Sequence, residues 1–301
     1  MVLNGVGGGL SYLVGPYLVP ENLVNTTHGI TDISNISGTA SSQMDTRYMI
    51  WCYMVEQAIV SVSLFLSIVL YFPAKPQIPP SVSASTTSGK GTDLVESVKI
   101  IFCDRNIMLC VLGCTLCTGV QGSWMGVMTL NFEPLGISEK ECGNIGVILT
   151  FVSILPALAI PIIMDHIRKQ FKVALVLVLA VTTGFYVWLT LIILKVLTFN
   201  WIQLYVSTIG GGSSVSVLMP LYFEYTAEIA YPVSEGVIGG VLSLGYNVSG
   251  IIFFSLFFIK NIGTVWMNYM VCASTAFTIP LVILTIGKYK RSELDNALCT
   301  S

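Results

Sequence analysis

The feature of this sequence that most constrains its fold is a series of long apolar stretches. A helix needs roughly 20 apolar residues to cross a bilayer, and eight stretches reach or approach that length. Only 10% of the residues are charged, against roughly 25% in soluble domains, so lipid must solvate much of the surface. The sequence therefore predicts an all-α membrane protein, with spans at residues 3–20, 49–72, 106–132, 143–164, 172–197, 201–224, 236–259 and 265–287.

The segments between these stretches suggest how the chain is divided. Residues 21–48 are polar and are expected to form a luminal loop between the first two helices. Residues 73–104 begin with prolines and continue into Ser, Thr and Gly, a composition typical of a flexible linker. We therefore predict a first part with two helices, a cytoplasmic linker, a six-helix part and a cytoplasmic tail, at residues 1–72, 73–104, 105–288 and 289–301.

The distribution of basic residues predicts the orientation of the chain. With the 21–48 loop outside, ten Lys and Arg residues lie on the inner side and four on the outer side, as the positive-inside rule requires. Two N-glycosylation sequons, at Asn25 and Asn35, then lie on the luminal side. The net charge of −2 argues against a nucleic-acid partner.

Motifs of enzyme chemistry are missing from the sequence. There are two histidines, no nucleophile elbow and no His/Cys set with metal-ligand spacing. Cys110, Cys114 and Cys117 form one helical stripe, and we favour packing residues over a soft-metal site. The glycines at 5–9 follow no strand, which argues against a nucleotide loop. We expect neither an enzyme nor a bound cofactor.

Charged residues at the inner ends of the spans are candidates for gating. Glu224 and Glu228 are four residues apart and share a helix face, and Glu235 follows the next turn. They could titrate protons, or they could form a structural ion-pair latch, which we favour. Asp165 and Arg168 lie in a tight turn between spans and either bridge two helix ends or anchor the inner face.

Four polar or aromatic residues lie at mid-depth in the predicted spans. Gln121 and Trp124 belong to one span, and Tyr246 and Asn247 belong to another. Amide groups can orient an organic solute and aromatic rings can stack on it, so these residues are candidates for a substrate site. Packing and hydrogen bonding between helices is the alternative role for each of them.

Three segments resemble a known family. Residues 12–20, residues 71–82 and the stretch from Pro220 to Gly236 are similar to the feline leukaemia virus subgroup C receptor-related family, solute carrier family 49 of the major facilitator superfamily. The resemblance covers essentially the whole chain. It implies a partial major facilitator fold equivalent to helices 5–12, in which residues 1–72 are the end of the N-terminal half and the first four helices are missing.

The resemblance also implies a function. The plasma-membrane members of this family are associated with choline and haem, and a lysosomal branch is associated with proton-coupled export of pyridoxine-type vitamers. We expect a secondary transporter of a small organic solute, a proton symporter in the lysosomal membrane rather than the plasma membrane. By the resemblance, Asn247 stands at the amide position of the choline-handling relatives, Trp124 lies near an aromatic one, and Gly5 replaces a glutamine.

Two other functions stay open at this point. One is a solute carrier of the choline or haem type. The other is a membrane scaffold or receptor that does not transport, or a truncated isoform that binds a full-length partner.

Overall fold

The computed structural model describes residues 36–71, 94–166, 170–287 and 289. Within these residues, seven helices are long and apolar enough to cross a membrane. They correspond to the last seven predicted spans, which are thereby confirmed. The first predicted span, residues 3–20, lies outside the described residues, as does Gly5.

The first described helix, α2 (Ile36–Tyr71), belongs to a compact unit of its own, residues 10–79. It begins 13 residues before the predicted start at residue 49, so the end of the expected 21–48 loop is helical. The apolar part of this helix, Met54–Tyr71, is the segment long enough to span a bilayer. Hydropathy predicts where the bilayer ends, whereas the helix continues until its backbone is interrupted, which explains the difference.

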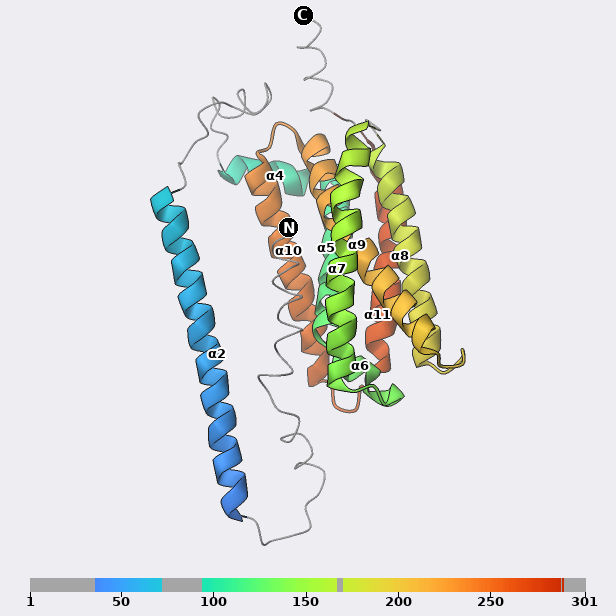
Figure 1. Ribbon diagram of the computed structural model, residues 1–301. Coiled ribbons are helices and arrows are strands. Elements are labelled where there is room, and N and C mark those ends of the chain that lie inside the picture. The colour runs from blue at the N-terminus through green and yellow to red at the C-terminus, as the bar shows by residue number, and fades with distance from the viewer. Residues whose placement is uncertain (1–35, 72–93, 167–169, 288, 290–301) are drawn as a thin grey trace, which may run out of the picture. The chain divides into compact units, whose positions relative to one another are not determined.

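Residues 94–103 belong to the predicted linker but form a short helix, α4 (Leu94–Cys103). This helix belongs to the second unit, which comprises residues 1–9 and 80–301. Ser97 and Ile101 are four residues apart and buried, which places them on one face. Helix α4 packs against α5 and α10 (Figure 1). A helix of ten residues is too short to span a membrane, and this is why a search for long apolar stretches misses it.

The rest of the second unit is a bundle of long helices joined by short connections (Figure 1). Asp104 caps the first of them because its side chain accepts a hydrogen bond from the backbone N–H of Asn106 at 2.8 Å. The predicted span 106–132 is interrupted at Val127, where φ is −117° and ψ is 22°. The long helices are α5 (Arg105–Gly126), α7 (Glu139–His166), α8 (Phe171–Ile193), α9 (Trp201–Ala230), α10 (Glu235–Ser255) and α11 (Val265–Leu284), and the short ones are α6 (Met128–Phe132), η2 (Glu133–Leu135) and η3 (Leu256–Phe258).

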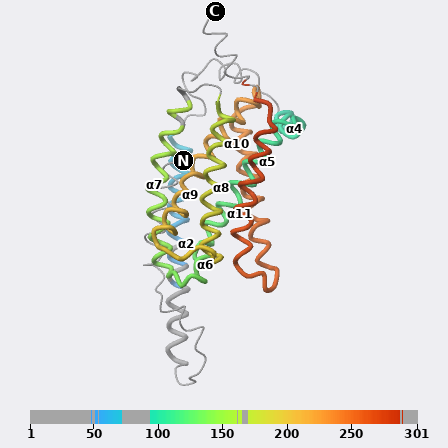
Figure 2. The backbone as a smooth tube through the Cα atoms, turned by 90° about the vertical axis from the view of Figure 1, so that its right-hand side faces the viewer, coloured from blue at the N-terminus to red at the C-terminus, as the bar shows by residue number. Residues whose placement is uncertain are grey.

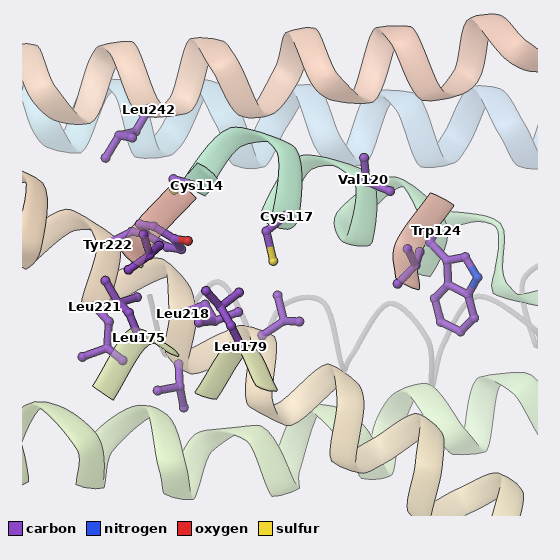
Figure 3. Packing of buried hydrophobic residues seen from close by; sticks show 14 of the residues in the cluster. Cys114, Cys117, Val120, Trp124, Leu175, Leu179, Leu218, Leu221, Tyr222 and Leu242 are labelled. Carbon is purple, nitrogen blue, oxygen red and sulfur yellow. The ribbon is translucent and has the colours of Figure 1, made fainter. Parts of the chain in front are cut away.

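Helix α5 lies at the centre of this bundle. It contacts α9, α10 and α11, while α8 packs between α9 and α11 (Figure 2). Side chains from α5, α8, α9 and α10 meet in one apolar core (Figure 3). Cys110, Cys114 and Cys117 are fully buried in this core, and their predicted packing role is confirmed.

Candidate functional site

Helices α5 and α10 approach each other closely because small residues line their crossing. A Cβ atom on Gly119 would lie 2.5 Å from the Cβ atom of Ser249 and 2.8 Å from the backbone oxygen of Tyr246. On the opposite helix, a Cβ atom on Gly245 would overlap the side chain of Thr115. The two helices can therefore keep this spacing only with glycine at both positions.

Substitution of Gly119 tests how strongly the crossing depends on this contact. In Gly119→Ala the new methyl group would clash with the backbone of α10. A backbone atom cannot rotate away as a side chain can, so the whole of α10 must shift. We expect a loss of about 1 to 2 kcal/mol in stability, measured as a lower thermal unfolding midpoint of the detergent-purified protein. Gly126→Ala is the matched control on the same helix, because no atom lies within 4 Å of its added Cβ. Equal losses in both variants would contradict the close-packing role.

A pocket of about 240 Å³ lies beside this crossing. It contains two of the predicted substrate-binding residues, Tyr246 and Asn247, together with hydroxyl and aromatic side chains. Its lining residues are Gly122, Ser123, Tyr246, Asn247, Gly250, Ile251 and Phe254.

The polar groups of this pocket leave room for a ligand. Asn247 is exposed, and its Nδ2 atom donates to the backbone oxygen of Ser243, one turn earlier, at 2.7 Å. Within the described residues no group donates to its Oδ1 atom. The half-buried ring of Tyr246 packs against Gly122. The pocket therefore offers an amide acceptor beside an aromatic ring.

The other two predicted substrate-binding residues belong to a buried amide–aromatic cluster. The indole N–H of Trp124 donates to Oδ1 of Asn268 at 3.1 Å. Asn131 and Asn268 donate to each other at 2.8 Å in both directions. Gln121 donates from Nε2 to the hydroxyl of Tyr186 at 3.0 Å. We call Gln121, Trp124, Asn131, Tyr186 and Asn268 the amide–aromatic cluster.

The structure therefore brings the four residues together in two pairs rather than in one site. Tyr246 and Asn247 line the pocket, whereas Gln121 and Trp124 make contacts inside the protein. Trp124 has 0% exposure and packs edge-on against Tyr186 at 5.7 Å between ring centroids. In this conformation Trp124 cannot touch a solute, and a binding role for all four residues stays a prediction.

The predicted gating acids differ in burial. Glu224 is exposed on α9, Glu228 is 7% exposed one turn later, and Glu235 is exposed in the first turn of α10. Each of the three takes part in an interaction within the protein. Asp165 lies in the last turn of α7. Its side chain, Arg168 and the sequon residues Asn25 and Asn35 lie outside the described part of the chain.

A different set of side chains holds the end of α11. The ammonium group of Lys172, on α8, donates to the backbone oxygens of Ile283 and Thr285 at 2.7 and 2.8 Å. These carbonyls lie at the helix C-terminus, where intrahelical partners run out and a cation is favoured. Lys172 therefore caps α11 from a neighbouring helix.

Two further contacts reinforce this cap. Oδ1 of Asn106, at the start of α5, accepts the backbone N–H of Ile286 at 3.0 Å. The hydroxyl of Tyr225, on α9, lies 2.7 Å from Oγ1 of Thr285. The contacts of Asn106, Lys172 and Tyr225 with residues 283–286 join four helices, and we call them the α11 latch.

Tyr289 lies just beyond the latch, close to one of the acidic residues, Glu228. Its ring is 6.3 Å from that of Tyr225, measured between centroids. Burial raises the pKa of the Tyr289 phenol, and the nearby Glu228 carboxylate adds to the increase. The phenol therefore stays neutral at physiological pH and is available as a hydrogen-bond donor.

The sequence contained a signal for some of these residues. Asn131 and Asn268 fall inside predicted spans, and the criterion that selected Gln121, an amide within the membrane, selects them as well. In the sequence, Lys172 carries a signal only as one of the positive charges expected on the inner side of the membrane. Its capping role depends on the packing of α8 against α11, which no local pattern reports.

Comparison with known proteins shows similarity to several membrane transporters. No protein-family model matches the chain. Among curated proteins, the chain is 26% identical over 297 residues to "Solute carrier family 49 member 4 homolog" of Xenopus laevis, covering 98% of this chain and 63% of that protein. It is 26% identical over 295 residues to "Choline/ethanolamine transporter FLVCR2" of Homo sapiens, covering 94% of this chain and 49% of that protein.

A more distant match extends this pattern. An "Uncharacterized MFS-type transporter" of Caenorhabditis elegans is 21% identical over 252 residues. All three matches cover 81% or more of this chain. The chain in turn spans less than two thirds of the length of the first relatives.

Proposed function

We propose that this chain is a member of solute carrier family 49 of the major facilitator superfamily, to whose members it is similar along most of its length, and that it forms part of a secondary transporter for a small organic solute. The pocket between α5 and α10 carries the proposal. It combines Oδ1 of Asn247, an acceptor that receives no hydrogen bond from the described residues, with the rings of Tyr246 and Phe254. An aromatic wall with few polar groups is the usual form of a site for a small organic molecule.

The size of the pocket fits one wall of a larger site. Its 240 Å³ fall below the roughly 300 Å³ at which pockets for drug-sized ligands begin. Transporters built from repeats place their substrate near the bilayer midplane, between two halves. We therefore propose that the pocket supplies the contribution of this bundle to a shared site, for a solute with few heavy atoms rather than for haem.

The substrate proposal follows from the relatives and the pocket together. One relative is named a choline and ethanolamine transporter, and the family resemblance implies pyridoxine-type vitamers for the lysosomal branch. Both kinds of solute carry hydroxyl groups that can donate to Oδ1 of Asn247. We propose a pyridoxine-type solute as the first candidate, choline or ethanolamine as the second, and the lysosomal membrane as the location.

Proton coupling is the finer part of the proposal. Glu228 is buried at the end of α9, close to Tyr289 and the α11 latch. A carboxyl group that gains or loses a proton there would change the charge beside contacts that join four helices. We propose that Glu228, with Glu224 and Glu235, couples protonation to the opening of this end of the bundle.

The test is uptake of radiolabelled pyridoxine and choline by cells that express the gene product containing this chain at the plasma membrane. We expect saturable uptake of one solute that depends on an imposed pH gradient. Asn247→Ala should weaken the apparent affinity by about five- to tenfold, since one hydrogen bond to the solute is lost.

Ser243→Ala is the matched control on the same helix, because it leaves the backbone oxygen that accepts from Asn247 in place. Normal uptake by Asn247→Ala would contradict the proposed site. Uptake that is insensitive to the pH gradient would contradict proton coupling alone. If neither solute is taken up, the proposed substrates are wrong.

A further inference from the structure

The end of helix α8 has an unusual residue at its cap. The backbone N–H of Val196 donates to the oxygen of Leu191, and that of Lys195 donates to the oxygen of Ile192, both at 3.0 Å. This pair of bonds is the Schellman arrangement, in which the residue after the helix adopts a left-handed conformation. Here that residue is Lys195, with φ of 57°.

Glycine is the usual residue at such a position, because a Cβ atom makes a positive φ unfavourable. Two other positive-φ residues of the described chain are Gly136 and Gly263, and a third is Asn261, a residue type that tolerates this conformation. Lysine has no such tolerance. The cap needs only the backbone of Lys195, so its side chain is not explained by the turn.

The side chain of Lys195 lines a pocket. This pocket, of about 360 Å³, lies between η2 and the connection from α8 to α9. It has two polar side chains, those of Lys195 and Thr198, and otherwise apolar walls. The lining residues are Pro134, Leu135, Ile192, Lys195, Leu197, Thr198 and Phe199.

In the part of the chain that the structure describes, the cation in this pocket has no paired counter-charge. Within the described residues, Lys195 forms no ion pair and no side-chain hydrogen bond, and the hydroxyl of Thr198 has no partner either. The pocket therefore presents one positive charge and one hydroxyl donor. An anionic oxygen group beside an apolar body is complementary to this combination.

The position of the pocket identifies the source of such a group. The candidate spans of α8 and α9 end at Ile193 and begin at Trp201, so Lys195 and Thr198 lie where lipid headgroups begin. Phe199 and Trp201 pack edge-on at 5.4 Å between ring centroids, and exposed aromatic residues at this depth are typical of a membrane interface. A soluble inorganic anion such as phosphate would gain nothing from the apolar walls.

We propose that this pocket binds the headgroup phosphate of an anionic phospholipid. Lys195 pairs with the phosphate, Thr198 donates to one of its oxygens, and the start of the acyl chains lies against Leu135 and Phe199. The lipid belongs to the leaflet at the end of the bundle that holds α6. This role is independent of the transported solute.

Substitution of Lys195 by glycine separates the side chain from the cap. In detergent without lipid, Lys195→Gly should unfold at the same temperature as the wild type or at a higher one, because glycine suits the left-handed backbone. With added phosphatidylglycerol the wild type should gain thermal stability, and native mass spectrometry should show a bound lipid. Lys195→Gly should bind that lipid about fivefold more weakly, whereas Lys195→Arg should keep the affinity.

Lys260→Gln is the matched control, since Lys260 is exposed in the connection between α10 and α11 and does not line the pocket. Phosphatidylcholine and inorganic phosphate should each stabilise the wild type less than phosphatidylglycerol does. Equal binding by Lys195→Gly would overturn the proposal. A loss of stability of Lys195→Gly in detergent alone would also overturn it. That result would mean that the ammonium group stabilises the C-terminal, negative end of the α8 dipole instead of binding a lipid.

Discussion

Asn268→Leu should lower the thermal unfolding midpoint by at least about 5 °C, the largest loss of stability that we expect from a single substitution in the bundle. Oδ1 of Asn268 accepts from both Trp124 and Asn131, and its Nδ2 donates back to Asn131. Leucine has a similar shape but no polar atoms. The indole N–H and the Asn131 amide would then be buried without partners, at a cost of about 2 to 3 kcal/mol.

The reciprocal bonds between the two amides allow a sharper form of this test. Asn131→Leu should also destabilise, because it leaves the Asn268 amide with one partner instead of two. The double variant Asn131→Leu/Asn268→Leu replaces both amides with apolar groups, so little beyond the indole N–H remains unpaired. We therefore expect the double variant to be more stable than the sum of the two single losses predicts.

The matched control for the cluster lies on the same helix. Thr275 is fully buried, but among the described residues its hydroxyl bonds only to backbone oxygens of its own helix, those of Val271 and Cys272. Thr275→Val should therefore change the midpoint little, since such bonds contribute little to helix stability. Additive losses in the double variant would show that the two amides act independently of each other. A loss in Thr275→Val equal to that in Asn268→Leu would show that the effect is not specific to the cluster.

The sequence predicted the helices well because the bilayer imposes a simple length rule. Seven of the eight predicted spans match described helices, although α2 and α9 run past the predicted boundaries, to Ile36 and Ala230. The break at Val127 left no mark in hydropathy, because the residues on both sides of it are apolar. Hydropathy reports depth in the membrane, whereas the path of the backbone depends on contacts with neighbouring helices.

The candidate site was harder to predict for the same reason. Gln121 and Tyr246 were selected because polar and aromatic groups at mid-depth need a partner. Which partner each one has depends on the direction in which it leaves its helix. Gln121 faces Tyr186 in the bundle, while Tyr246 packs at the α5–α10 crossing. One sequence pattern therefore identified residues of a buried cluster and residues of an open pocket together.

The opposite end of the bundle gives the second large expected effect, in Lys172→Met. Methionine keeps the apolar stem of lysine but removes the ammonium group that binds the oxygens of Ile283 and Thr285. Hydrogen bonds to a charged group contribute about 1.5 to 3 kcal/mol, so the end of α11 should open more often. Backbone amides at 279–287 should exchange with deuterium about tenfold to a hundredfold faster.

The pattern of exchange distinguishes a local latch from general stability. Asn106 and Tyr225 hold residues 285 and 286 from two other helices, so Tyr225→Phe should speed exchange in the same segment by a smaller factor. Lys99→Met is the control, because Lys99 is exposed on α4 and lies outside the latch. Faster exchange throughout the bundle in Lys172→Met would mean that Lys172 supports the whole fold. Faster exchange confined to 279–287 would identify the latch as the contact that holds this end of the bundle closed.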